Sequence, residues 1–237
     1  MKEMKKNKIF LTMIFLTLFG ILNCMNVKAD GNFLLISDKD SYVNVDDPLT
    51  NYGLSQSLRL DTNYEIYLHF TFPQEYFDYR WEKINMTLYS HAYTSGTINI
   101  SICTTSNVWE EDTIVWDNKP SHGTLLASYQ EKADWEIEDY TLNVYLDLLN
   151  FITNNGRLKQ DELSLCIYSE FSENIMYVTY NSKDSLAWGT YNGARIELTG
   201  THDPSGENTP NIYSYDLFLF VLIAILSSIF IILRKKK

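Results

Sequence analysis

KINMTLYSH, from Lys83 to His91, and TINISICT, from Thr97 to Thr104, set the pattern of this chain. In each stretch apolar side chains take every second position, so one face of the segment is apolar and the other is polar. Period-two alternation over a short run is typical of a β-strand with one buried face. Both stretches therefore predict strands of a sheet that covers a core.

The same alternation recurs between Asn32 and Gly200, in runs separated by Asn, Asp, Gly, Ser and Pro. Many short strands at this spacing predict an all-β sandwich or barrel. In VYLDLLNFITNNG, apolar residues at helical spacing predict one short helix, Tyr145 to Asn154, that ends at Asn155-Gly156. The other expected strands are NFLLIS (Asn32–Ser37), SYVNV (Ser41–Val45), SLRLD (Ser57–Asp61), EIYLHFTF (Glu65–Phe72), WEIEDYTL (Trp135–Leu142), ELSLCIYS (Glu162–Ser169), MYVTYNS (Met176–Ser182) and ARIELTG (Ala194–Gly200).

Residues 1–29 have the organisation of a secretory signal peptide. A basic start, MKEMKKNK, precedes the uncharged apolar run Ile9–Leu22, and the small or modest residues Val27 and Ala29 fit a cleavage site before Asp30. An uncleaved signal anchor is the alternative.

The other end of the chain predicts a single membrane span. Residues 217–233 carry no charge, and 17 residues is at the short end of the ~17–25 that cross a bilayer. Residues 234–237, RKKK, follow at once and place this end on the cytoplasmic side. A removed lipid-anchor signal is the alternative, but such signals usually lack a terminal basic cluster. We expect residues 30–200 to be displayed outside the cell membrane, joined to the span by a polar linker, residues 201–216.

The expected outer part is strongly acidic. Between Asp30 and Ile212 there are 10 Lys or Arg and 28 Asp or Glu residues, so its net charge is near −18. Such a surface repels nucleic acid and anionic polymers. It suits neutral or cationic partners, divalent cations or salty surroundings, with solubility alone as the alternative.

Two cysteines and two glycosylation sequons lie within the expected strands. Cys103 and Cys166 each fall on the strand face opposite the apolar one. Outside the cell they could form a cross-strand disulfide if their strands are neighbours, and two free thiols are the alternative. Asn85 and Asn99 each begin an N-x-S/T sequon.

The sequence offers no recognisable catalytic motif. There is no Gly-rich phosphate loop, no G-x-S-x-G turn and no CxxC pair. The four histidines lie far apart in the sequence, and His69, in an alternating strand, is expected to point to solvent. Glu110, Glu111 and Asp112 are adjacent, so in an extended segment they alternate in direction. They cannot by themselves form the facing carboxylate pair of a glycoside hydrolase.

Four aspartates near the start of the outer part are candidate calcium ligands, because calcium takes carboxylate and carbonyl oxygens. They lack a defined loop spacing, so a solvated surface is the alternative. No other cofactor is expected. The four are Asp38, Asp40, Asp46 and Asp47.

Aromatic residues are abundant, with 5 Trp, 17 Tyr and 12 Phe. Rings can stack on the apolar C–H face of a sugar, although most must belong to the core of a protein of this size. Rings in polar sequence contexts are the better candidates for exposure and ligand binding. These candidates are Trp81, Trp135, Trp188 and Tyr191.

Two segments form a recognisable pair. The first is SDKDSYVNVDDPLTNYGLSQSLRLD, Ser37–Asp61, with the turn Asn51-Tyr52-Gly53 before the strand S-x-L-R-L. The second fits the pattern W-x-E-x-x-I-T-W-x-N-x-P through Trp109, Glu111, Trp116 and Pro120, with Val115 where Thr is usual. Together the two segments resemble the DNRLRE domain, which is grouped as carbohydrate-binding module family 96.

The resemblance implies a jelly-roll-like β-sandwich that binds a polysaccharide of a matrix or cell wall. It also implies that Trp109 and Trp116 pack within the fold and that the neighbouring acids are not catalytic. Some relatives bind acidic glycans, but the few basic residues here favour a neutral glycan. The expected function is a non-catalytic, membrane-anchored binding or adhesion domain. The alternatives are a structural envelope protein without sugar affinity and a polysaccharide hydrolase or lyase.

Overall fold

The computed structural model describes residues 30–93, 96–133, 143–173, 177–185 and 193–203. They belong to one unit by their contacts, Ala29–Pro204. The expected signal peptide and the expected span at residues 217–233 lie outside the described residues, so both stay predictions. Among the described residues, no helix is long and apolar enough to cross a membrane.

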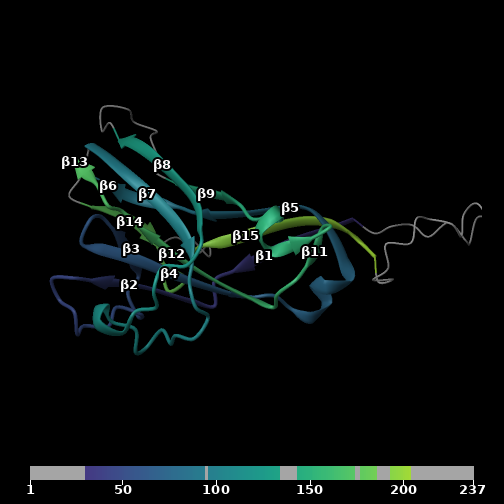
Figure 1. Cartoon of the computed structure of the whole chain (residues 1–237), viewed down its shortest axis with the longest axis horizontal. Helices are drawn as coiled ribbons and strands as arrows, with labels where there is room; N and C mark the ends of the chain where they lie inside the picture. The colour runs from purple at the N-terminus through teal and green to yellow at the C-terminus, as the bar shows by residue number, and fades with distance from the viewer. Residues whose placement is uncertain (1–29, 94–95, 134–142, 174–176, 186–192, 204–237) are drawn as a thin grey trace, which may run out of the picture. The chain divides into compact units, whose positions relative to one another are not determined.

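One antiparallel sheet has the strand order β1-β15-β5-β9 (Figure 1). Leu198 of β15 lies opposite Phe33 of β1 on one side and Ile84 of β5 on the other. These side chains share the inner face, because residues directly opposite in a ladder point the same way. The bounds are β1 (Asp30–Ile36), β5 (Tyr79–Leu88), β9 (Val144–Asp147) and β15 (Arg195–His202).

A three-stranded sheet, in the order β3-β14-β6, follows directly from the first. The chain passes from β5 through Tyr89 into β6, and the Asn181 N–H donates to the Tyr89 carbonyl (3.0 Å). The bounds are β3 (Ser57–Leu60), β6 (Ser90–Tyr93) and β14 (Val178–Asn181).

The largest sheet has six strands in the order β13-β7-β12-β4-β2, with β8 paired to β7. Ile66, Leu68 and Phe70 of β4 lie opposite Ile167, Leu165 and Leu163 of β12. The bounds are β2 (Lys39–Asn44), β4 (Tyr64–Thr71), β7 (Gly96–Thr104), β8 (Leu125–Ala133), β12 (Glu162–Tyr168) and β13 (Ser172–Glu173).

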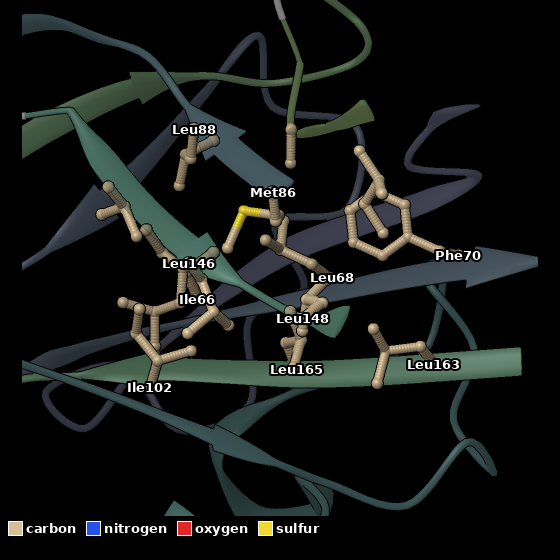
Figure 2. Packing of buried hydrophobic residues seen from close by; sticks show 14 of the residues in the cluster. Ile66, Leu68, Phe70, Met86, Leu88, Ile102, Leu146, Leu148, Leu163 and Leu165 are labelled. Atoms are coloured by element: carbon tan, nitrogen blue, oxygen red, sulfur yellow. The ribbon is translucent and has the colours of Figure 1, made fainter. Parts of the chain in front are cut away.

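One large apolar cluster joins the inner faces of these sheets. Figure 2 shows Leu68 and Leu165 of the six-stranded sheet close to Met86 and Leu148. Met86 lies in β5, and Leu148 directly follows β9. Leu58 of β3 belongs to the same cluster. Burial of apolar area at roughly 25 cal/mol per Å² is the main driving force for such packing. The expected all-β sandwich is confirmed.

The expected helix from Tyr145 to Asn154 is wrong in extent. Its first half is strand β9, which pairs with β5 and directs Val144 and Leu146 into the core. Only one helical turn remains, α2 (Leu149–Ile152). Tertiary pairing outweighs the helical spacing because it buries the apolar residues at alternate positions.

The Asn155-Gly156 pair makes a hairpin turn. It joins β10 (Thr153–Asn154) to β11 (Arg157–Leu158), and both turn residues have positive φ, 52° and 79°. A two-residue Asn-Gly loop with this backbone is the preferred tight hairpin. The remaining short elements are the 3₁₀ helices η1 (Gln74–Asp78) and η2 (Trp116–Asn118).

Strand β8 has no counterpart among the expected strands. Its sequence, LLASYQEKA, alternates weakly, and its side chains are half-buried or exposed. It pairs with β7 along most of its length. By contrast, the expected strand WEIEDYTL lies outside the described residues.

A second, smaller apolar cluster lies on the outer face of the six-stranded sheet. Tyr67 and Cys166, which face away from the main core, pack there against Trp109 and Ile114 of the segment 105–124. His69 is also on this face, and it is 3% exposed, so the expectation that it points to solvent is wrong. Strand alternation gave its direction, but the covering segment is distant in sequence.

Candidate functional site

The ligand-binding candidates chosen from sequence context are not brought together among the described residues. Trp81 is only 2% exposed, so its expected exposure is wrong. Its ring packs against Phe33 and Tyr79, and its Nε1–H donates to the Tyr76 carbonyl (3.2 Å). The polar neighbours in its sequence point outward, whereas Trp81 itself points to the core. Trp135, Trp188 and Tyr191 lie outside the described residues.

The two segments that carry the family resemblance meet in space. The Asn51 side-chain amide donates to the carbonyls of Glu111 and Ile114, both at 2.8 Å. Gly53 lies so close to Glu111 that an added Cβ would sit 2.0 Å from its carbonyl oxygen. Trp109 is 6% exposed, and its Nε1–H donates to the Ser164 hydroxyl (3.1 Å). These residues therefore fix the segment 105–124 onto the sheet.

Trp116 and Pro120 lie at the far end of that segment. Trp116 is half-buried, with the Lys119 ammonium 3.8 Å from its ring centroid. The Pro120 carbonyl accepts a hydrogen bond from the Tyr67 hydroxyl (3.1 Å). Trp109 thus packs as the resemblance implies, and Trp116 packs only in part.

A buried acid holds the segment before β15 to the sheet edge. Asp40 accepts hydrogen bonds from the Ser182 hydroxyl (2.8 Å) and the Lys183 N–H (2.6 Å). Burial raises the pKa of Asp40 to about 6, against these hydrogen bonds, which lower it. The Lys183 ammonium lies 3.0 Å from Glu111 and 2.8 Å from Asp184. Asp40, Glu111 and Asp184 are close enough to share a cation, but this lysine already balances two of them.

The other candidate calcium ligands have different protein partners. Asp38 lies 2.6 Å from the His69 ring. Asp46 accepts from the Asn63 amide (2.9 Å), and Asp47 accepts from the Tyr52 hydroxyl (3.2 Å). A structural calcium ion stays a prediction.

A row of tyrosines around one arginine is a candidate ligand surface among the described residues. The Arg59 guanidinium lies between the rings of Tyr64 and Tyr177, 4.5 and 4.4 Å from their centroids. Tyr42 continues the row: its centroid lies 5.8 Å from that of Tyr64 and 4.3 Å from that of Tyr52, with which it stacks. We call these five residues the tyrosine–arginine surface.

Local structure explains why these side chains converge. Arg59 occupies the outward phase of β3, since Leu58 and Leu60 on either side are fully buried. The hairpin from β3 to β4 closes with an Asp61–Tyr64 bridge and so brings Tyr64 beside Arg59. Tyr177 precedes β14, the strand paired with β3.

The surface has both apolar and polar components. Tyr42 is buried and forms the floor, whereas Tyr52, Arg59, Tyr64 and Tyr177 are half-buried. The Arg59 Nε is buried and has no hydrogen-bond partner among the described residues. Burial raises the pKa of Tyr42 and of Tyr52, so both hydroxyls are neutral at physiological pH, and that of Tyr52 donates to Asp47. Aromatic faces with nearby hydroxyl and guanidinium groups can bind a ligand that is itself part apolar and part polar.

Most of this surface was not among the candidates taken from the sequence. Tyr52 was expected only as a structural residue, and the other tyrosines lie in runs that read as ordinary strands. The available signal was Arg59, a charged residue in a strand, five residues before Tyr64. The partner Tyr177 depends on the pairing of β3 with β14, which no local pattern predicts.

The cysteines and the sequons are placed on strands as expected. Cys103 of β7 lies directly opposite Cys166 of β12, and both are buried free thiols. Asn85 is half-buried on β5, and Asn99 on β7 accepts a hydrogen bond from the Gln130 amide (2.9 Å). A disulfide and the two glycans stay predictions.

A buried carboxylate, Glu65, lies near these thiols. The Lys119 ammonium is 2.5 Å from its Oε2, and the His122 Nε2 is 3.1 Å from the same atom. Burial alone would raise the pKa of Glu65, but hydrogen bonds from these two residues outweigh it and hold that pKa below its ordinary value. Glu65 is therefore a charged group on the outer face of the sheet, and Lys119 and His122 stabilise its charge.

Some solved structures show a distant likeness to this chain. Dimeric latent PorU from Porphyromonas gingivalis is 9% identical with a TM-score of 0.29, and the match covers 74% of this chain but 13% of that one. A family 28 carbohydrate-binding module specific for non-crystalline cellulose is 11% identical with a TM-score of 0.25, covering 58% and 65%. A family 11 module from Clostridium thermocellum, in complex with a β-1,3-1,4-mixed-linked tetrasaccharide, is 13% identical with a TM-score of 0.22, covering 76% and 92%.

TM-scores this low carry no functional argument, and no curated protein matches the chain. The sequence match to a family is stronger evidence. It extends over residues 32–191, which include the three-stranded sheet, the six-stranded sheet, the segment 105–124 and all strands of the four-stranded sheet except β15 and the start of β1. The chain belongs to carbohydrate-binding module family 96.

Proposed function

We propose that this chain is a non-catalytic polysaccharide-binding protein, displayed on the cell surface by a C-terminal membrane span. Family membership supports carbohydrate binding as the general activity. The expected signal peptide and the apolar run at residues 217–233 support display outside the membrane. A jelly-roll-like sandwich with a short cytoplasmic tail would then present its ligand surface outside the cell.

The observation that carries the proposal is the tyrosine–arginine surface. Tyr52 stacks on Tyr42 and Tyr64 is tilted against it, so the half-buried rings of Tyr52 and Tyr64 offer apolar area for the C–H faces of sugars. The Arg59 guanidinium, held between two rings, offers N–H donors in a fixed plane for sugar hydroxyls. Binding affinity is higher where the side chains that contact the ligand are already ordered, because less conformational entropy is lost on binding.

Charge favours a neutral polysaccharide. The outer part carries 10 basic and 28 acidic residues between Asp30 and Ile212, which repels a polyanion at low salt. Exposed Asp46 and Asp47 lie beside the surface through their bonds to Asn63 and Tyr52. Carboxylates there would accept hydrogen bonds from sugar hydroxyls and oppose a uronic acid.

The test is a glycan-array and insoluble-polysaccharide pull-down screen with the full chain purified in mild detergent. We expect saturable binding to one neutral polysaccharide, with little change between low and moderate salt. Binding only to acidic glycans, lost as salt rises, would contradict the neutral ligand. A folded protein that binds no glycan would favour a structural envelope protein instead.

A further inference from the structure

The two cysteines occupy one point on the outer face of the six-stranded sheet. Cys103 and Cys166 are direct cross-strand partners on β7 and β12. Side chains at directly opposite positions point the same way, with Cβ atoms about 4.5–5.5 Å apart. The Cys103 thiol lies 3.7 Å from the Cys166 carbonyl oxygen. Both sulfurs therefore lie under the segment 105–124.

Two further metal-ligating side chains reach the same point. Glu65 comes from β4, the neighbour of β12, and its Oε2 lies 3.9 Å from the Cys166 sulfur. His122 comes from the covering segment, and its Nε2 lies 3.1 Å from the same oxygen. The ligand atoms of Glu65, His122 and Cys166 all lie within 4.8 Å of one another.

These groups match the ligand chemistry of a thiophilic cation. Zinc binds thiolate sulfur, imidazole nitrogen and carboxylate oxygen in a tetrahedron, with bonds of about 2.0–2.3 Å. Ligand atoms at such a site are about 3.3–3.8 Å apart, so those of Glu65, His122 and Cys166 need to approach by at most about 1.5 Å, and Cys103, directly opposite Cys166, is the fourth candidate ligand. We propose that Cys103, Cys166, His122 and Glu65 form a binding site for a thiophilic divalent cation, with Zn²⁺ the best fit.

Charge and access are consistent with this site. Two thiolates would neutralise the cation, and the Lys119 ammonium, 2.5 Å from the Glu65 Oε2, would give up its contact with that oxygen when the ion binds. The two sulfurs are buried, but the His122 side chain is 33% exposed and lies over the site, stacked on Tyr168. Movement of this one imidazole would open a path for the ion.

The site would link β4, β7, β12 and the segment 105–124, which are far apart in sequence. A bound ion that is absent from the unfolded chain stabilises the fold by mass action. The function of the site would therefore be to fix the covering segment, independently of any glycan.

The experiment uses the full chain in mild detergent, reduced and stripped of metal with a chelator, and titrates it with Co²⁺. We expect one equivalent to give a thiolate-to-cobalt charge-transfer band and the visible bands of a tetrahedral site. Zn²⁺ should displace the cobalt and raise the Tm. Cys166→Ser and His122→Gln should each weaken cobalt binding by at least about tenfold, since removal of even an outer-shell partner costs about 10–100-fold.

His202→Gln is the matched control. This exposed histidine lies on β15 of the four-stranded sheet, where it contacts Tyr79, and not on the six-stranded sheet that carries the proposed site. Its cobalt spectrum should equal that of the unaltered chain. If Cys166→Ser does not fold by circular dichroism, the exposed His122→Gln variant still decides the outcome. The proposal is overturned if the unaltered chain gives no charge-transfer band, if the variants bind cobalt equally well, or if protein taken from cells carries a Cys103–Cys166 disulfide.

Discussion

At the residue scale, single polar side chains hold the two family segments together. Asn51 uses both of its amide hydrogens on backbone carbonyls of the segment 105–124, and its own oxygen accepts from the Gly53 N–H (3.2 Å). Tyr52 of the same turn packs against the core, so the amide of Asn51 is the group that joins the turn to the segment 105–124 by hydrogen bonds. This explains why the short turn Asn51-Tyr52-Gly53 and the distant Trp109 segment occur together in the sequence.

Asn51→Asp tests that role with almost no change of shape. The variant puts a carboxylate where two carbonyls need donors, and each unmet buried partner costs about 1–3 kcal/mol. We expect the free energy of unfolding to fall by at least that amount, measured by urea denaturation. Asn154→Asp, at an exposed position of β10 opposite Arg157, is the matched control and should change stability little. Equal losses in both variants would contradict the assigned role.

Asp40 gives a pH-dependent prediction. Its pKa is raised to about 6 in the folded chain from an ordinary value of 3.8. Between these pH values the unfolded chain releases the proton first, so stability falls as pH rises through this window. The fall is on the order of 3 kcal/mol, at 1.36 kcal/mol per pKa unit, and none of it remains to be lost above about pH 6.

Asp40→Asn should abolish this contribution. We expect the stability advantage of the unaltered chain over Asp40→Asn to be largest near pH 4 and to shrink as the pH rises to 6. Urea unfolding of both proteins at several pH values measures it. Curves that stay parallel across this range would show that Asp40 ionises with an ordinary pKa.

At the element scale, the segment 105–124 is a cover for one sheet. Trp109 is buried among residues of the outer face, whereas Trp116 is half-buried at the end of the segment. The two tryptophans occur in one motif and look equivalent in sequence. Only their different packing separates a structural ring from one that contacts solvent.

Trp109→Ala and Trp116→Ala should therefore differ in their effects. Loss of a buried Trp side chain costs about 3–5 kcal/mol, because a cavity remains. We expect that loss for Trp109 and less than about 2 kcal/mol for Trp116, by denaturant unfolding at one pH. A larger loss for Trp116 than for Trp109 would contradict this account, since it would mean that Trp116 contributes more to holding the segment 105–124 on the sheet.

The same scale shows what local sequence can predict. Alternation predicted most strands and the direction of most side chains, because a strand with one buried face has a period of two. It failed for Tyr145 to Asn154, where helical spacing and strand pairing competed, and for β8, whose alternation is weak. It also failed for His69 and Trp81. His69 lies on the outer face but is buried by the segment 105–124, which is distant in sequence. Trp81 lies in a polar stretch, and only the packing of its strand shows that its side chain points to the core.

The tyrosine–arginine surface shows the same limit. Arg59 and Tyr64 are neighbours across one hairpin, so their contact could have been inferred from the sequence. Tyr177 and Tyr42 join them only through the pairing of β14 with β3 and the packing of β2 beside the hairpin. A site assembled from such long-range pairings carries no continuous motif.

At the scale of the whole molecule, the two end segments differ in charge and hydrophobicity from the acidic part between them. Nine of the 19 Lys and Arg residues lie in the two end segments, residues 1–28 and 234–237, whereas 28 of the 30 Asp and Glu residues lie between Asp30 and Ile212. This division fits a chain that displays an acidic domain outside and keeps a basic tail at the inner face of the membrane.

If the proposed span anchors the chain, deletion of residues 217–237 should release the protein from the membrane, because the apolar run that would cross the bilayer is gone. Immunoblots of membrane and medium fractions measure this. A control that deletes residues 205–209 of the linker should stay with the membrane. Release of the unaltered chain would contradict the anchor.

The central claim is that the tyrosine–arginine surface binds polysaccharide, and one comparison tests it most directly. The dissociation constant for the glycan found by screening is measured for the full chain and for Tyr177→Ala, Arg59→Lys and Tyr145→Ala. Tyr145, which is 62% exposed on β9 of the four-stranded sheet, serves as the control. We expect Tyr177→Ala and Arg59→Lys to weaken binding at least about tenfold, or about 1.4 kcal/mol, since lysine keeps the charge but not the planar stack. Unchanged binding in these two folded variants, or an equal loss in Tyr145→Ala, would contradict the account.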